Sequence, residues 1–159
     1  MFNRPSIVLV APEIPGNTGT IGRTCVALDF DLVLIKPLAF DISEKAVRRA
    51  GLDYWKDVRC HQFESFDDFL LKVGPAPDQL FFFSKRAEKT YFHAPFSAHS
   101  VLIFGSETKG LPSILQSKYQ ERSYSLPMYS DKIRSLNLAN AATAVGYEVI
   151  RQIHHRSAP

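Results

Sequence analysis

The sequence predicts an α/β protein whose mostly parallel sheet is flanked by helices. Continuous apolar runs stand at residues 6–11, 31–36, 79–84 and 100–104, as is typical of strands buried on both faces. Segments with a helical pattern separate these runs, and strand–helix alternation indicates parallel βαβ units. Polar stretches follow several of the runs, and ligands of open α/β sheets bind beyond the carboxyl ends of the strands.

The first part of the chain predicts two strands and two helices. The sequence PEIPG ends the first strand, and residues 16–29 predict a turn followed by a helix. Residues 31–36 form the second expected strand, which Pro37 ends. Ser43 can cap a short basic helix that ends at Gly51.

The middle of the chain continues the alternation. A weak strand is expected at residues 58–63. Ser65 and Asp68 resemble a capping box ahead of the helical run FDDFLLKV. Beyond the strands at 79–84 and 100–104, we expect a short helix at residues 112–118 and a last strand at residues 122–126.

The final helix has two faces of different character. Its apolar residues are spaced by four, three, four and four, which places them on one helical face. They are Leu138, Ala142, Val145, Val149 and Ile153. A second face carries the small residues Ala139, Thr143 and Gly146, which allow close approach of another helix in the same chain or in a second copy.

Length and composition indicate one soluble domain over residues 1–159, with no appended RNA-binding domain. No apolar run approaches the roughly 20 residues that span a bilayer, and the N-terminal segment reads as a strand and not as a signal peptide. Cys25 and Cys60 have neither metal-ligand spacing nor a disulfide framework, which fits a reducing cytoplasm. No metal site is expected.

The net charge of +3 is weak evidence for a nucleic-acid partner, although the basic residues cluster. The clusters are Arg48, Arg49, Lys56 and Arg59; Lys85, Arg86 and Lys89; Lys132 and Arg134; and Arg151, His154, His155 and Arg156. For any one cluster, solvated surface is the default interpretation.

The stretch GNTGTIGR at residues 16–23 places glycines between a strand and a helix, where a backbone can approach a ligand closely. It matches neither GxGxxG nor GxxxxGK[ST], so a nucleotide phosphate loop is poorly supported. If the turn folds back, Asn17 and Arg23 can both point towards the sheet edge. Arg23 suits a phosphate, and a surface salt bridge is the alternative.

Two further stretches follow apolar runs. In GSETKGLP at residues 105–112, Glu107 can accept hydrogen bonds from a ligand or from backbone N–H groups, or can lie exposed in a turn. Ser135 and Asn137 stand at the entry to the final helix, where either can cap it or face a cleft. We expect all three stretches to meet in one site. The absence of HExxH, GxSxG and CxxC disfavours zinc hydrolysis, elbow-serine hydrolysis and thiol redox chemistry.

Together the three stretches resemble the signature motifs of the SpoU branch of the SPOUT-class RNA ribose 2′-O-methyltransferases. The matching residues are Asn17, Gly19 and Arg23; Phe104, Gly105, Ser106, Glu107, Gly110 and Leu111; and Leu126, Pro127, Met128, Ser135, Leu136, Asn137, Leu138, Ala139, Asn140 and Ala141. Ser106 stands where proline is usual. PEIPGNTGTIGRTC and RRAGLDYW more specifically resemble the members that methylate the tRNA wobble nucleotide, cytidine or uridine 34.

The resemblance implies a deep C-terminal trefoil knot, a homodimer with composite active sites, and S-adenosylmethionine as cofactor. The implied catalytic residues are Arg23, Asn17, Glu107, Ser135 and Asn137, and the implied cofactor contacts are Phe83, Ser84, Gly105, Leu126 and Ser135. Asn17 and Glu107 would orient the reacting groups. Arg23 would be the general base or, since an arginine pKa is about 12.5 or higher, an electrostatic clamp on phosphate and alkoxide.

tRNA is the expected substrate. The candidate phosphate contacts are Arg23, Lys85, Arg86, Lys132, Arg134 and the tail at residues 151–156. An unstacked base can stack on Tyr129 or Tyr147, although the helical pattern favours core packing for Tyr147. The alternatives are methylation at another RNA position, an inactive knotted RNA-binding protein, and a nucleotide-binding oxidoreductase that uses residues 16–23.

Overall fold

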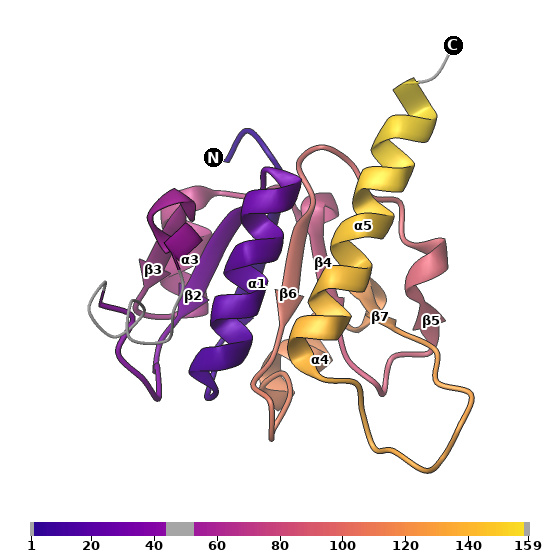
Figure 1. The fold of residues 1–159 in the computed structure, drawn as a ribbon. Helices are drawn as coiled ribbons and strands as arrows, with labels where there is room; N and C mark the ends of the chain where they lie inside the picture. Colours follow the sequence, from indigo (N-terminus) through magenta and orange to yellow (C-terminus); the bar gives the residue numbers. More distant parts are fainter. Residues whose placement is uncertain (1, 44–52, 158–159) are drawn as a thin grey trace.

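The computed structural model describes residues 2–43 and 53–157, and these form a sheet covered by helices on both faces (Figure 1). Seven strands, all paired in parallel, lie in the order β3-β2-β1-β6-β4-β7-β5. The strands are β1 (Ser6–Val10), β2 (Asp31–Ile35), β3 (Cys60–Phe63), β4 (Leu80–Phe83), β5 (Lys89–Thr90), β6 (Val101–Phe104) and β7 (Ser123–Ser125). The helices are α1 (Pro15–Leu28), α3 (Phe66–Val73), α4 (Ser113–Lys118) and α5 (Leu138–Ser157), with short 3₁₀ turns η1 (Asp53–Asp57), η2 (Pro77–Gln79), η3 (Tyr91–His93) and η4 (Gln120–Arg122).

The predicted strands and helices are present with small shifts at their ends, apart from the helix capped by Ser43. That helix would occupy residues 44–51, which lie outside the described residues, as do Arg48 and Arg49. The sequence did not predict β5, because a two-residue strand leaves no apolar run.

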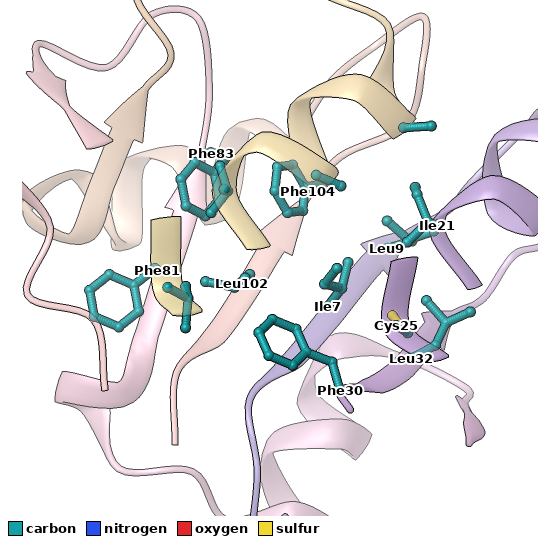
Figure 2. Close-up of a cluster of buried hydrophobic side chains, with 14 of the residues drawn as sticks. Ile7, Leu9, Ile21, Cys25, Phe30, Leu32, Phe81, Phe83, Leu102 and Phe104 are labelled. Carbon is teal, nitrogen blue, oxygen red and sulfur yellow. The ribbon is translucent and has the colours of Figure 1, made fainter. Parts of the chain in front are cut away.

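Helices α1 and α5 cover one face of the sheet and lie side by side in Figure 1. Beneath them, the inward side chains of the central strands form a cluster that includes Ile7, Leu9, Leu102 and Phe104 (Figure 2). The predicted apolar face of α5 supplies its share, since Ala142, Val145 and Val149 are fully buried and Leu138 and Ile153 pack against the same cluster.

The small-residue face of α5 contacts α1 of the same chain. The hydroxyl oxygens of Thr143 and Thr24 lie 2.8 Å apart. A Cβ atom on Gly146 would come within 2.8 Å of Leu28 Cδ1, so the absence of a side chain there sets the close spacing of the two helices. An intrachain contact therefore accounts for this face.

Helices α3 and α4 cover the opposite face through Phe66, Phe69 and Leu115. The start of α3 follows from its sequence, because the Ser65 hydroxyl accepts from the Asp68 N–H at 3.0 Å. The Asp68 carboxylate reaches back to the Glu64 N–H, one residue further than in a capping box.

Two expectations need correction, one about the backbone and one about a side chain. The stretch at residues 16–23 is not a turn that folds back, because α1 begins at Pro15 and runs through it. Tyr147 is not a core residue: its side chain is 56% exposed, since the helical face it occupies points away from the sheet.

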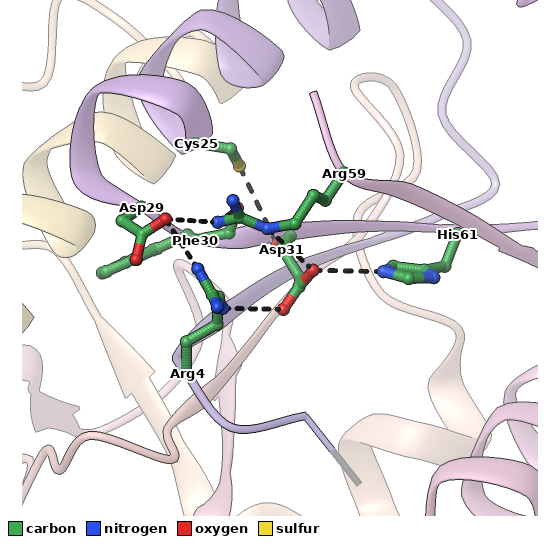
Figure 3. A network of polar contacts seen from close by, with 7 residues as sticks. All are labelled: Arg4, Cys25, Asp29, Phe30, Asp31, Arg59 and His61. Carbon is green, nitrogen blue, oxygen red and sulfur yellow. Dashed lines mark hydrogen bonds and ion pairs between the residues drawn. The ribbon is translucent and has the colours of Figure 1, made fainter. Parts of the chain in front are cut away.

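A network of ion pairs lies at the amino-terminal end of β2 (Figure 3). Buried Asp31, at the start of β2, is approached by Arg4, Arg59 and His61 at 3.8, 3.4 and 3.1 Å. Both arginines also hold exposed Asp29, and they lower the pKa of its carboxyl group. Arg59 of the first basic cluster is therefore engaged within the protein.

Cys25 and Cys60 form no disulfide bond. Burial raises the pKa values of both thiols, that of Cys60 to about 12. They are therefore protonated at neutral pH. Among the described helices, none has the length and hydropathy needed to cross a bilayer.

Replacing Phe82 by alanine tests the core beneath α3 and α4. The ring is fully buried and stacks on Tyr119 at 4.3 Å, so we expect Phe82→Ala to lower the free energy of unfolding by about 3–5 kcal/mol. Urea denaturation measures the loss. Leu71→Ala, which shortens a side chain of α3 that is 84% exposed, is the control, with an expected change below about 0.5 kcal/mol. Equal losses in the two variants would contradict this account of the core.

Candidate active site

The Glu107 carboxylate ties the loop after β6 to the start of α1. One of its oxygens accepts from the Glu13 N–H at 2.7 Å, and the other accepts from the Ile14 N–H at 3.0 Å and the Asn17 amide at 3.2 Å. Ile14 is the residue before α1 and has no capping side chain of its own. The carboxylate therefore supplies the negative charge and the acceptors that a helix start needs.

Asn17 passes this link on to the start of α5. Its carbonyl oxygen accepts from the Asn137 amide at 3.0 Å, and the Asn137 carbonyl oxygen accepts from the Ala139 and Asn140 N–H groups. Because each amide gives its NH₂ to one neighbour and its oxygen to the other, both side chains have one orientation. Two bonds that span 90 and 120 residues of sequence thus join the three segments, as the sequence predicted.

Asn137, and not Ser135, caps α5. It therefore acts as the helix cap, one of the two roles considered for it, and it also touches the first motif. The hydroxyl of Ser135 is exposed in the segment between β7 and α5, the loop that extends furthest below the sheet in Figure 1. Within the described part of the chain, no hydrogen bond links Ser135 to Asn17, Glu107 or Asn137.

The loop at residues 105–111 is closed on itself. Ser106 and Gly110 exchange two backbone hydrogen bonds, and Gly110 has a φ of +68°. The Ser106 hydroxyl accepts from the Lys109 N–H at 3.3 Å, so serine in place of the usual proline has a partner within the loop. A Cβ atom on Gly105 would lie 1.9 Å from the Gly110 carbonyl carbon, so this position admits only glycine.

Four of the five expected cofactor residues lie at one edge of the sheet. Phe83 is paired in register with Phe104 on one side and Tyr124 on the other. The residues that follow these strands, Ser84, Gly105 and Leu126, are therefore brought together at neighbouring carboxyl ends. The Phe83 and Phe104 rings stack 4.7 Å apart within the buried cluster beneath α1 and α5.

Arg23 points in another direction. Six residues along a helix correspond to a rise of about 9 Å and a turn of about 240°, so Asn17 and Arg23 lie on different faces of α1. Asn17 is 9% exposed, whereas Arg23 is at the surface. Among the described residues, Arg23 forms no ion pair, and no contact joins it to the cofactor edge. The structure thus separates Arg23 from the other motif residues within one chain.

Sequence reasoning missed the surroundings of Arg23. Its guanidinium carbon lies 5.4 Å from the centroid of the Tyr54 ring, and the Tyr54 hydroxyl donates to the Gly19 carbonyl at 2.8 Å. Trp55 and Val58 pack against Gly22. The available signal was the aromatic pair Tyr54 and Trp55 in LDYW, because such rings can pack on a helix at a position that carries no side chain, such as Gly22.

The candidate RNA contacts form an exposed basic margin along the same edge. Lys85 and Arg86 follow β4, and Lys132 and Arg134 lie in the segment before α5; all four side chains are exposed. Tyr129, in that segment, is 94% exposed. In the tail, Arg151 is held by Glu148 at 2.8 Å, His154 and His155 are exposed, and the side chain of Arg156 lies outside the described residues.

The described residues contain no group of three His, Cys, Asp or Glu side chains close enough to hold a metal ion. The edge offers the half-buried side chains of Ser84 and Leu126 at the strand ends, with exposed basic side chains beside them. The basic side chains suit an anionic polymer.

A family model described as the SpoU rRNA Methylase family matches residues 4–147. A tRNA (cytidine(34)-2′-O)-methyltransferase of Burkholderia cenocepacia is 40% identical over 153 residues, which cover 96% of each chain. A solved structure described as giving structural insights into the 2-OH methylation of C/U34 on tRNA superposes with a TM-score of 0.85 at 39% identity, covering 96% of this chain and 97% of that one. The SpoU methyltransferase AviRb of Streptomyces viridochromogenes, in complex with the cofactor AdoMet, has a TM-score of 0.80 at 26% identity and covers 99% of this chain and 63% of its own.

Replacing Glu107 by glutamine tests the tie between the loop and α1. An amide keeps one oxygen but turns an NH₂ group towards backbone donors, so we expect Glu107→Gln to lower the free energy of unfolding by about 1.5–3 kcal/mol. Chemical denaturation measures it, with Glu88→Gln, a change at an exposed carboxylate, as the control. A denaturation midpoint equal to that of the control would refute the proposed tie.

Glycine-to-alanine changes at two positions give a matched test of the closed loop. Gly105→Ala forces main-chain atoms apart, and we expect a loss of at least about 3 kcal/mol or failure to fold. Gly16→Ala meets nothing within 4 Å on a helix, so it is expected to be neutral or to stabilise by up to about 1 kcal/mol. Thermal unfolding of both variants checks the pair, and a well-tolerated Gly105→Ala would show that the loop has another conformation.

Proposed function

The chain belongs to the SpoU rRNA methylase family, and from this premise we propose that it methylates the ribose 2′-hydroxyl of the tRNA wobble nucleotide, cytidine or uridine 34. The observation that carries the proposal is the hydrogen-bonded chain from Glu107 through Asn17 to Asn137, which unites the three motif segments. The substrate is supported by the Burkholderia cenocepacia relative and by the solved structure for methylation of C/U34.

The methyl donor is proposed to be S-adenosylmethionine, the cofactor held by the AviRb structure. The residues fit this group. Ser84, Gly105 and Leu126 lie together at the carboxyl ends of neighbouring strands, where the half-buried Ser84 and Leu126 offer a hydroxyl and an apolar side chain to it. The sulfonium supplies a methyl group that is already electrophilic, so the residues have to position the ribose and handle its proton. We assign Ser135, exposed beside this edge, to cofactor and ribose.

Glu107, Asn17 and Asn137 contribute to the reaction by holding the two helix starts in place. Their polar groups bond to one another and to the backbone, so they fix the edge at which the ribose must lie. Correct alignment of oxygen, carbon and sulfur contributes several kcal/mol in favourable cases. Arg23 is assigned to the RNA, as the base that removes the 2′-hydroxyl proton or as a cation beside the phosphate and developing alkoxide.

The active site is proposed to be composite. Since Arg23 is exposed and lies on a different face of α1 from Asn17, a homodimer would bring Arg23 of one protomer to the cofactor edge of its partner. We also propose the family's trefoil knot, formed as the segment at residues 126–137 passes into α5. We further propose that the protein is a single domain that acts in the cytoplasm. It would bind tRNA through its own surface.

The tRNA is proposed to bind along the basic margin formed by Lys85, Arg86, Lys132 and Arg134. These exposed cations would neutralise phosphates, which makes binding salt-dependent. Tyr129 and the exposed ring of Tyr147 are suited to stacking on unpaired bases of an anticodon loop.

The first test is transfer of labelled methyl from S-adenosylmethionine to bulk tRNA, followed by nucleoside mapping. We expect a 2′-O-methylpyrimidine at position 34. Methylation of another ribose would replace the wobble assignment, and tRNA binding without transfer to any RNA would favour an inactive RNA-binding protein. Binding of NAD(H) in place of S-adenosylmethionine would support an oxidoreductase.

Arg23 variants test its part in the reaction. Arg23→Ala removes the charge and the planar fork, and we expect kcat/KM for tRNA to fall about 10²-fold. Arg23→Lys keeps the charge and is expected to retain part of the activity. Lys72→Ala, on α3 across the sheet, is the control for loss of a cation and should transfer methyl normally. Full activity in both Arg23 variants would exclude base and clamp alike.

A further inference from the structure

We propose that Tyr54 is a positioning residue that holds the Arg23 guanidinium in place against the RNA, so that Arg23 acts as a clamp and not as a general base. This inference rests on the proposed function. It starts from the short turn η1, which lies beside α1 and is joined to it by Tyr54 and Trp55.

Tyr54 is fixed at both ends of its side chain. Its half-buried ring faces the Arg23 guanidinium at 5.4 Å, within the range of about 6 Å for a cation–π contact. Its hydroxyl donates to the Gly19 carbonyl, one turn earlier on α1. Burial raises the pKa of Tyr54, so the phenol keeps the proton that this bond requires.

The turn that carries Tyr54 is held in place independently. A Cβ atom on Gly22 would lie 2.7 Å from the Trp55 ring and 3.3 Å from Val58, so η1 packs closely on α1 beside Arg23. Tyr54 therefore presents its ring from a docked segment, and the guanidinium of an otherwise exposed arginine has a defined place.

The contact favours the clamp over the base. The quadrupole of an aromatic ring attracts a guanidinium, so Tyr54 restrains where that of Arg23 lies. A cation that binds phosphate gains from this restraint, because it loses fewer rotamers on binding. Removal of the ring is therefore expected to weaken the binding of tRNA.

The experiment compares Tyr54→Leu, Tyr54→Phe and wild-type protein in methyl transfer to tRNA. If Tyr54 positions a clamp, Tyr54→Leu lowers kcat/KM for tRNA about threefold to tenfold, and Tyr54→Phe, which keeps the ring, stays within about twofold. An unchanged or raised rate in Tyr54→Leu overturns the proposal. Phe92→Leu, an aromatic change on η3 near the opposite end of the sheet, is the matched control.

Trp55, the single tryptophan of the chain, reports whether η1 stays docked through its fluorescence. Gly22→Ala provides the second route, because it pushes the Trp55 ring away while Tyr54 and Arg23 remain. If Tyr54→Leu itself undocks η1, the proposal predicts that Gly22→Ala lowers kcat/KM to a similar extent. If Gly22→Ala changes the Trp55 fluorescence but transfers methyl at the wild-type rate, the proposal is overturned.

A binding cycle separates this inference from the proposed function. tRNA affinity is measured for Arg23→Ala, Tyr54→Leu and the double variant. If the ring acts through Arg23, Tyr54→Leu weakens binding in the wild-type background and adds nothing in Arg23→Ala. Additive effects overturn the inference. Absence of methyl transfer by the wild-type chain would overturn the proposed function alone, since the cycle requires only binding.

Discussion

The interaction on which the rest of the site depends is the acceptance of two backbone N–H groups and one amide by the Glu107 carboxylate. Without it, α1 would begin with unsatisfied donors, because Ile14 has no side chain that can cap a helix. Through Asn17 the same carboxylate also fixes Asn137, which starts α5. One charged group therefore sets where α1 and α5 begin.

The motif residues fall into two groups by their contacts. Glu107, Asn17 and Asn137 form hydrogen bonds mainly with one another and with the backbone, whereas Ser135 and Arg23 are exposed and form no hydrogen bond with these three among the described residues. The former group maintains the geometry of the edge and the latter is free to meet ligands. The closed loop around Gly105 belongs to the maintaining group, since its packing leaves no room for a side chain.

The sequence predicted the strands well because a strand buried on both faces leaves a continuous apolar run, as in residues 31–36. The meeting of the three motifs was also predictable, because parallel strands end at one edge. The helical state of the whole stretch at residues 16–23 was not predictable. Its three glycines and Asn17 favour a turn, but the Glu107 carboxylate, distant in sequence, caps a helix there. Tyr54 was missed for a related reason: its contact with Arg23 depends on how η1 docks, and no local pattern encodes that.

The bonds that unite the motifs also set an order of events in folding. They join residues 90 and 120 positions apart, so their formation must wait for large loops to close. During synthesis, the N-terminal strand and α1 emerge long before Asn137, and α1 lacks its carboxylate until Glu107 has followed. The nascent chain is therefore expected to complete its binding edge only when α5 has been made, so a truncated product would expose no finished site to RNA.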